Sequence, residues 1–184
     1  MVWFWYFIIY SFLGCLLEIL FALISRHRLE SRKCHCLLPI CPVYGAGAIA
    51  VLFLTEPISH SPWFIFLAGA VICTIVEYLT SLFYEKILYV EFWSYQGSKF
   101  NLAGRVCLSF SAAWGIVSLI LIYLIHPQIS PWVQEIPLAI SIIMIIIFTF
   151  DLAISAIRLR KTRDKSCLEI FSLSTLRHAR EKSQ

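Results

Sequence analysis

The chain has 184 residues, of which 60% are hydrophobic and 14% are charged, and its formal net charge is +4. A soluble domain averages about 45–50% apolar and about 25% charged residues, so a soluble fold of this length could not cover so much apolar surface. The composition therefore excludes a soluble globular class. It predicts an integral membrane protein whose surroundings are the lipid bilayer.

Five segments are apolar enough to be transmembrane helices, each of which needs about 20 mostly apolar residues. They are residues 2–25, 39–55, 62–84, 106–126 and 133–157. The second is short, and the first resembles no signal peptide because no basic residue precedes its long apolar run. The predicted fold class is all-α: a bundle of five transmembrane helices over residues 1–157, followed by a basic cytoplasmic tail over residues 158–184.

The basic residues predict how this bundle is oriented. All fifteen Lys and Arg residues lie in residues 26–33, 86–105 and 158–182, whereas the connections at 56–61 and 127–132 contain none. Because basic residues remain on the cytoplasmic side, we expect the N-terminus outside and the C-terminus in the cytoplasm. The tail would contact anionic lipid headgroups, at roughly 1 kcal/mol per basic side chain. The net charge therefore requires no nucleic-acid partner.

Three carboxylates are predicted at nearly the same depth. Glu18, Glu77 and Asp151 lie six or seven residues before the inner ends of three segments, or about 9–11 Å below the cytoplasmic boundary. Intramembrane charges usually face a protein interior and mark a functional site. Arg105 opens the fourth segment from the inside, and its guanidinium could reach Glu18 or Glu77. The alternative is structural: these carboxylates fix the helix packing, and this reading has the most weight for Asp151.

Six ordered motifs run from residue 10 to residue 115. They are Tyr10-Ser-Phe-Leu-Gly-Cys-Leu-Leu-Glu18, Leu38-Pro-Ile-Cys-Pro-Val-Tyr-Gly-Ala-Gly47, Glu77-Tyr-Leu-Thr-Ser81 with Glu85, Phe92-Trp-Ser-Tyr95, Phe100-Asn-Leu-Ala-Gly-Arg-Val-Cys-Leu108, and Ser111-Ala-Ala-Trp-Gly115. This set resembles the bacterial membrane family called putative ABC-transporter type IV, or CmpB-like. Members of that family usually have Trp-Asp-Tyr where this chain has Ser94 between its Trp and Tyr.

The resemblance implies a multi-pass protein of the bacterial plasma membrane and a set of motif residues. These are Glu18, Cys41, Pro42, Tyr44, Gly45, Glu77, Ser81, Glu85, Trp93, Tyr95, Asn101, Gly104, Arg105, Ser111 and Trp114. From them we expect a polar centre for substrate binding in the inner leaflet. It would comprise Glu18, Glu77, Asn101 and Arg105, with Tyr44, Trp93 and Tyr95 near its inner mouth and Ser81 and Glu85 alongside.

The favoured function is membrane transport, as a permease-like component of unknown substrate. The sequence contains no G-x-x-x-x-G-K-[ST] loop to bind phosphates, so any ATPase would be a separate chain. Five short helices do not easily enclose a transport pathway. We therefore expect either homo-oligomerisation or a partner membrane subunit, with the glycine and serine stripes as candidate contact faces.

Two other functions remain open. A membrane enzyme could use the carboxylates, Arg105 and Asn101 on a lipid or phosphate-bearing substrate at the inner leaflet. Against it, the sequence shows no Ser-His-Asp grouping, so an enzyme is the less favoured reading. A non-transporting scaffold would use the same charges to fix helix register. We expect no metal or other cofactor, because Cys34-His35-Cys36 with Cys41 matches no standard zinc spacing.

Overall fold

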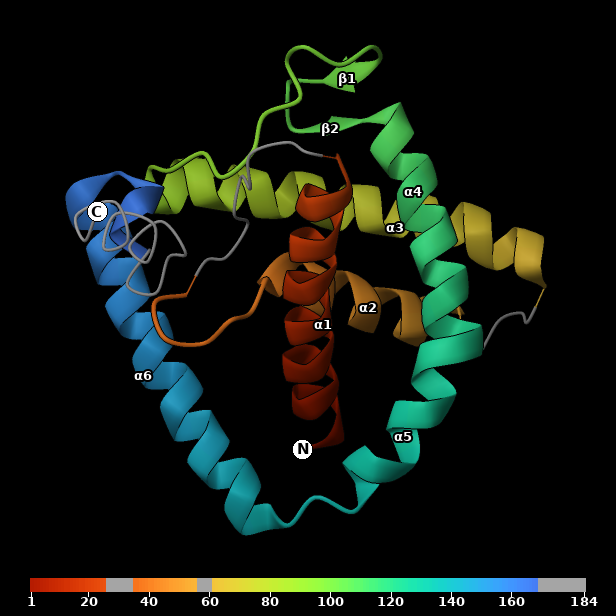
Figure 1. The fold of residues 1–184 in the computed structure, drawn as a ribbon, viewed down its shortest axis with the longest axis vertical. Coiled ribbons are helices and arrows are strands. Elements are labelled where there is room, and N and C mark those ends of the chain that lie inside the picture. The colour runs from red at the N-terminus through yellow and green to blue at the C-terminus, as the bar shows by residue number, and fades with distance from the viewer. Residues whose placement is uncertain (26–34, 56–60, 169–184) are drawn as a thin grey trace, which may run out of the picture.

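The computed structural model describes residues 1–25, 35–55 and 61–168 (Figure 1). Its elements in chain order are α1 (Val2–Ser25), α2 (Pro42–Thr55), α3 (Pro62–Phe83), the π-helical turn η1 (Tyr84–Leu88), β1 (Asn101–Leu102), β2 (Val106–Cys107), α4 (Leu108–Ile120), the π-helical turn η2 (Leu121–Ile125), α5 (His126–Gln134), α6 (Leu138–Thr162) and the 3₁₀ turn η3 (Lys165–Leu168). The expected helical class is confirmed. The structure adds one short hairpin to it, in which β1 and β2 pair antiparallel.

Four helical stretches in the described part of the chain are long and apolar enough to cross a membrane. They are Val2–Phe21, Pro62–Leu88, Leu108–Gln134 and Leu138–Thr162. The remaining predicted segment is α2, which has 14 residues and is therefore about 21 Å long. That is shorter than a hydrocarbon core of about 30 Å. The membrane class follows from the four long helices, whereas a count of five spans stays a prediction.

The predicted outer connection at residues 127–132 is wrong, because these residues are helical. The chain continues from α4 through η2 into α5, and the connection to α6 falls at residues 135–137. Pro127 lies in the first turn of α5 and Pro131 lies inside it, so this continuous helix accommodates two residues that have no backbone N–H. The prolines here therefore shape a helix instead of ending one.

Glycines let neighbouring helices approach closely. A Cβ added to Gly14 of α1 would lie 2.2 Å from the Tyr44 ring of α2. A Cβ on Gly69 of α3 would lie 2.3 Å from Ser118 Oγ of α4, and Gly115 is equally crowded by Phe66. Small residues bring membrane helices together in this way. The predicted glycine and serine stripes are thus used, at these positions, for contacts within one chain.

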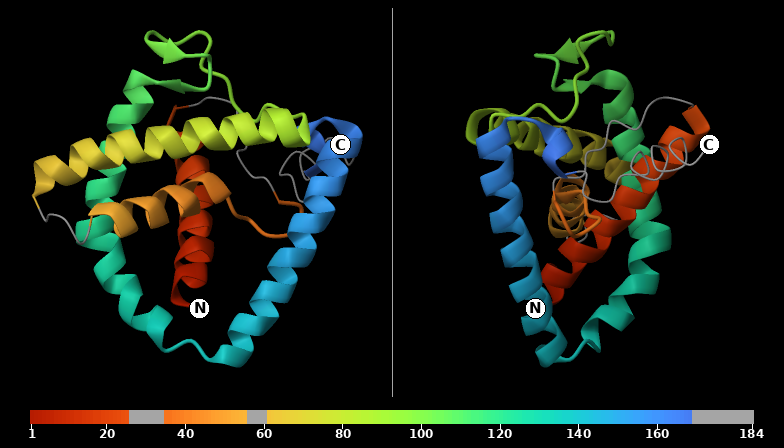
Figure 2. Two further views of the ribbon diagram at one scale, coloured as in Figure 1. Left: turned by 180° about the vertical axis from the view of Figure 1, so that it is seen from behind. Right: turned by 60° about the vertical axis from the view of Figure 1, so that its left-hand side comes forward.

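The helices cross one another instead of lying parallel (Figures 1 and 2). Helices α2 and α3 lie side by side and run across α1, whereas α4–α5 and α6 stand on either side and converge at residues 135–137. The N-terminus lies at this converging end, and the hairpin and the C-terminal end of α6 lie at the opposite end. Because α2 and α3 run across α1, the predicted bundle of five spans stays a prediction. Which end faces the cytoplasm stays a prediction from the basic residues.

The connection between η1 and α4 is compact and partly buried. Tyr89 ends η1 in the left-handed region at φ 60°, and the chain then buries Phe92, Trp93 and Tyr95 before it forms the hairpin. The Lys165 ammonium of η3 donates to the Phe92 carbonyl at 3.1 Å, which ties the end of α6 to this connection. The connection is therefore a fixed part of the fold.

The basic tail is described only as far as residue 168, and residues 169–184 lie outside the described part. Helix α6 continues to Thr162, so the first residues of the predicted tail are still helical. Just beyond it, the hydroxyl and the backbone N–H of Ser166 donate to the Asp164 carboxylate, and both hydrogen bonds lower the pKa of Asp164.

Candidate functional site

Glu77 is the best-buried acid of the predicted polar centre. It lies in the long helix α3, and its side chain has 0% exposure. The Tyr95 hydroxyl donates to Glu77 Oε1 at 2.9 Å, and the Trp114 indole N–H donates to Oε2 at 2.8 Å. One donor comes from the η1–α4 connection and the other from α4. A buried carboxylate needs such donors, because burying it without them costs several kcal/mol.

Glu18 is joined to Glu77 through two aromatic side chains. The Tyr44 hydroxyl donates to Glu18 Oε1 at 2.6 Å. The Tyr44 ring packs on the Trp114 ring with centroids 5.0 Å apart, a separation at which aromatic rings attract each other. Glu18, Tyr44, Trp114, Glu77 and Tyr95 therefore form one connected set, which we call the carboxylate network. It links α1, α2, α3, α4 and the connection after η1.

The local sequence explains why the network forms here. Gly14 lies one helical turn before Glu18 and leaves space for Tyr44 to reach across from α2. Beside Glu77, the Thr74 hydroxyl donates to Ser111 Oγ at 2.7 Å and fixes α3 against α4 one turn away from the Trp114 contact. Close packing and interhelical hydrogen bonds together hold the donors on the carboxylates.

A cavity borders the network. It has a volume of about 300 Å³ and lies between α1, α2 and α4, and Tyr10, Tyr44, Cys73, Trp114 and Ser118 are among its lining residues. Two members of the carboxylate network thus form part of its wall. A carboxylate held by hydroxyl and indole donors can exchange one of them for a substrate group, or accept a proton. The cavity adjoins the network through Tyr44 and Trp114, whereas its wall is mostly apolar and neither Glu18 nor Glu77 is among its lining residues.

Arg105 binds a different acid from the ones expected. Its guanidinium pairs with the Glu85 carboxylate and lies 5.7 Å from the centre of the Tyr78 ring. Lys86 also contacts Glu85, at 3.2 Å. Glu85 lies eight residues beyond Glu77 along the same helical run, about 12 Å further toward its end. Arg105 lies in the hairpin turn between β1 and β2, so it meets this acid and not the deeper Glu77 or Glu18.

Asn101, Trp93 and Ser81 lie beside the network. Asn101 is exposed and stabilises the hairpin turn, where its amide donates to the Ser98 carbonyl and its oxygen accepts the Gly104 N–H at 3.0 Å. The Trp93 indole donates to the Arg105 carbonyl at 3.1 Å. Ser81 is buried one turn beyond Glu77 on the same face of α3. Asn101 and Trp93 therefore position the backbone that carries Arg105.

Asp151 belongs to a separate cluster. It has 0% exposure and accepts the backbone N–H groups of Leu37 and Leu38 at 3.0 and 2.9 Å. His35 Nδ1 lies 3.2 Å from the same carboxylate, and the Ser155 hydroxyl donates to it at 3.3 Å. The carboxylate thus anchors the segment that leads into α2 against α6. These contacts match the structural reading of Asp151.

The structure therefore brings together a serine, a histidine and an aspartate that the sequence did not connect. Their hydrogen bonds are not those of a nucleophilic site. Ser155 donates to Asp151 and accepts the Cys36 backbone N–H at 2.9 Å, whereas a nucleophile must give its proton to the histidine. Among the described residues, no group of three or more His, Cys, Asp and Glu side chains is placed to hold a metal ion.

Long apolar helices and a buried carboxylate network define a helical membrane protein with a polar interior. The chain belongs to the family described as Putative ABC-transporter type IV, whose model matches residues 5–157. The resemblance seen in the motifs is thereby confirmed. No curated protein and no solved structure matches the chain.

Sequence reasoning missed two features of the site. Trp114 was a motif residue without a role, and the structure makes it the link between Glu77 and Tyr44. Its position one turn after Ser111 on the α3-facing side of α4 was the available signal. His35 was considered only as a metal ligand, and its contact with Asp151 spans 116 residues, so no local pattern could have shown it.

Proposed function

We propose that this protein is a permease-like component of a transporter in the bacterial cell membrane, and that the carboxylate network is its polar centre. Membership of an ABC-transporter-type family supports the transport class. The observation that carries the proposal is the complete burial of Glu77 within a helix long enough to span the membrane. An intramembrane acid of this kind is costly, and it is usually retained for a pathway or a binding site.

The connection after η1 would couple the network to events at the membrane surface. It carries Tyr95, which donates to Glu77, and Arg105, which pairs with Glu85. These two parts are joined, since the Tyr95 N–H donates to the Gly104 carbonyl at 2.7 Å. A force on the hairpin would therefore act on both acids at once. We propose this connection as the route by which a partner controls the polar centre.

The partner would be a separate ATPase that docks at the hairpin on the cytoplasmic side. Phe100 and Leu102 are exposed at the hairpin and offer an apolar contact. A second copy of the chain or another membrane subunit would complete the wall of the pathway. The basic segment that begins at Arg158 would lie against anionic headgroups. Asn101 and Trp93 would support the site by shaping the connection.

Purification from native membranes tests this proposal. We expect the tagged wild-type protein and Glu77→Gln to co-purify with ATP hydrolysis activity, because Glu77 lies away from the docking surface. The double variant Phe100→Ser, Leu102→Ser should lose that activity, whereas the control Tyr123→Ser, exposed on η2, should keep it. Wild-type protein without any ATPase would contradict the proposal. Conversion of a lipid or phosphate ester by the purified chain alone would favour the membrane enzyme instead.

A further inference from the structure

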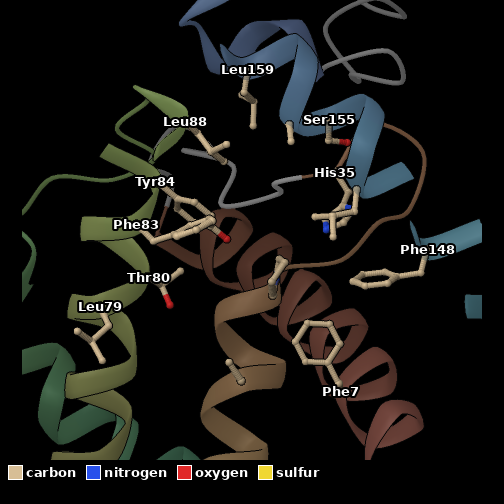
Figure 3. Close-up of a pocket in the computed structure, with 14 residues that line it drawn as sticks. Phe7, His35, Leu79, Thr80, Phe83, Tyr84, Leu88, Phe148, Ser155 and Leu159 are labelled. Atoms are coloured by element: carbon tan, nitrogen blue, oxygen red, sulfur yellow. The ribbon is translucent and has the colours of Figure 1, made fainter. Parts of the chain in front are cut away.

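A second cavity lies on the other side of α2 from the carboxylate network. It has a volume of about 570 Å³ and lies between α1, α2, the α3–η1 helix and α6 (Figure 3). Its wall is mostly apolar and includes Phe7, Leu79, Phe83, Phe148, Leu152 and Leu159, together with the polar side chains of His35, Thr80 and Ser155. We call this cavity the α6 groove. Nothing in the proposed transport role requires it.

Part of the groove wall is exposed at the molecular surface. Three of its lining residues are also large exposed apolar side chains: Leu79 is 56% exposed, Phe83 is 52% exposed and Leu152 is 46% exposed. On helices that cross a membrane, exposed apolar side chains face lipid hydrocarbon. A groove edged by such residues admits an acyl chain from the side, with no need for the helices to separate.

The guanidinium of Arg163 lies near one end of the groove. On α6 the lining residues Leu152, Ala156 and Leu159 recur at helical spacing. Arg163 is the C-cap of α6, in the left-handed region at φ 56°, and its backbone N–H donates to the Leu159 carbonyl at 2.8 Å. Its guanidinium lies over the Tyr89 ring at 5.2 Å from the ring centre, next to the groove residue Leu88. A guanidinium stacked on a ring keeps N–H donors at its edge, and these suit a phosphate.

We propose that the α6 groove binds an anionic phospholipid of the surrounding membrane, with one acyl chain along Leu152, Ala156 and Leu159 and the phosphate at Arg163. The chemistry of the two parts matches the two parts of such a lipid. The groove supplies hydrocarbon contact, and the end of α6 supplies a positive charge at the depth of the headgroup. The lipid would hold α6 against α2 and α3, alongside the Asp151 cluster.

Photo-crosslinking in vesicles tests this site. The probe is phosphatidylglycerol with a diazirine in its acyl chain, present as a minor share of phosphatidylcholine vesicles that contain the full chain. We expect crosslinks on α6 and α3 peptides that line the groove. Unlabelled phosphatidylglycerol should compete for them in the wild-type protein. Crosslinks that resist this competition would show only the ordinary lipid around the protein and would overturn the proposal.

Two matched alanines on α6 separate the groove from the lipid-exposed face of the same helix. Ala156→Trp should fill the groove and reduce to background the crosslinking that unlabelled phosphatidylglycerol suppresses in the wild-type protein. Ala153→Trp, on the exposed face, should leave that crosslinking unchanged. Equal labelling of the two variants would overturn the acyl-chain site. If Ala156→Trp does not fold, competition by unlabelled phosphatidylglycerol in the wild-type protein still decides whether the groove binds this lipid.

Arg163→Gln tests the headgroup. It should weaken competition by phosphatidylglycerol about fivefold and leave competition by phosphatidylcholine unchanged. Lys161→Gln is its control, because Lys161 is exposed and lies one turn after Ile157, which does not line the groove. If phosphatidylcholine competes as well as phosphatidylglycerol and Arg163→Gln alters neither, the anionic part of the proposal fails. These outcomes are independent of ATPase co-purification, so the failure of one proposal does not imply the failure of the other.

Discussion

Trp114 donates its indole N–H to Glu77 across the contact between α4 and α3, at 2.8 Å. The same ring packs on Tyr44, whose hydroxyl binds Glu18. One side chain thus connects the two acids that the sequence placed at similar depth. The functional proposal depends on this link, and its parts can be tested one at a time.

Trp114→Phe should destabilise the protein by about 1–3 kcal/mol, because it removes the donor to Glu77 Oε2 and leaves the carboxylate buried. The readout is the thermal midpoint in detergent. Trp132→Phe, at an exposed tryptophan of α5, is the control and should change little. In a double-mutant cycle with Glu77→Leu, which removes the acceptor, we expect a coupling free energy well above 0.5 kcal/mol. Additive effects would mean that the hydrogen bond contributes nothing.

Tyr44→Phe should keep the ring contact with Trp114 and lose only the hydroxyl that binds Glu18. A hydrogen bond to a charged group contributes about 1.5–3 kcal/mol, so we expect a stability loss in that range. Tyr89→Phe serves as the control, because Tyr89 is exposed and its contact with Arg163 is made by the ring. A variant as stable as the control would show that Glu18 does not depend on Tyr44.

Asp151→Asn should destabilise the protein without a specific effect on transport. Its carboxylate accepts two backbone N–H groups through different oxygens, and an asparagine would turn an NH₂ group toward one of them. We expect a loss of about 1–3 kcal/mol and lower abundance in the membrane. Asp164→Asn, an exposed acid just after α6, is the comparison. A stable Asp151→Asn protein that lacked function would move Asp151 into the working site.

Arg105→Lys should have little effect on stability, less than about 1 kcal/mol, because the partner Glu85 is partly exposed. It should nevertheless loosen the connection, since lysine cannot reproduce the guanidinium contact with Tyr78. Hydrogen exchange of residues 99–107 should therefore become faster. Lys86→Gln, which removes the other cation beside Glu85, should leave that exchange unchanged. Unaltered exchange in Arg105→Lys would show that the contacts of the Arg105 guanidinium do not stabilise the hairpin.

The sequence predicted what depends on hydropathy and on one helix at a time. The long spans, the glycine contact at Gly14 and the burial of Glu77 follow from apolar length, small residues and position in a helix. Charge complementarity predicts that Arg105 needs a carboxylate, but it does not select Glu85 over Glu77. That choice depends on the shape of the hairpin, where Phe100 and Ala103 adopt positive φ values. Non-glycine residues rarely adopt such values, so the sequence gives no signal for this shape.

Long-range placement explains the other differences. The approach of His35 to Asp151 depends on how α6 packs beside the segment before α2, and no periodicity relates two residues 116 positions apart. The limits of the apolar segments predicted a connection at residues 127–132, which include Pro127 and Pro131. The π-helical turn η2 and the start of α5 place Pro127 in a first turn instead. Local propensity was overridden there by the continuity of one long apolar helix.

The central claim is that Glu77 works in transport and is more than a packing residue. The most direct test expresses Glu77→Gln in a strain that lacks the gene and measures both rescue of the strain's defect and the amount of folded protein in the membrane. Glutamine keeps hydrogen bonds to Trp114 and Tyr95 within reach, because the tyrosine hydroxyl can also accept one. We predict near-normal abundance with loss of rescue, while Glu91→Gln at an exposed acid rescues fully. Full rescue by Glu77→Gln, or a loss of rescue that only follows a loss of protein, would contradict the account.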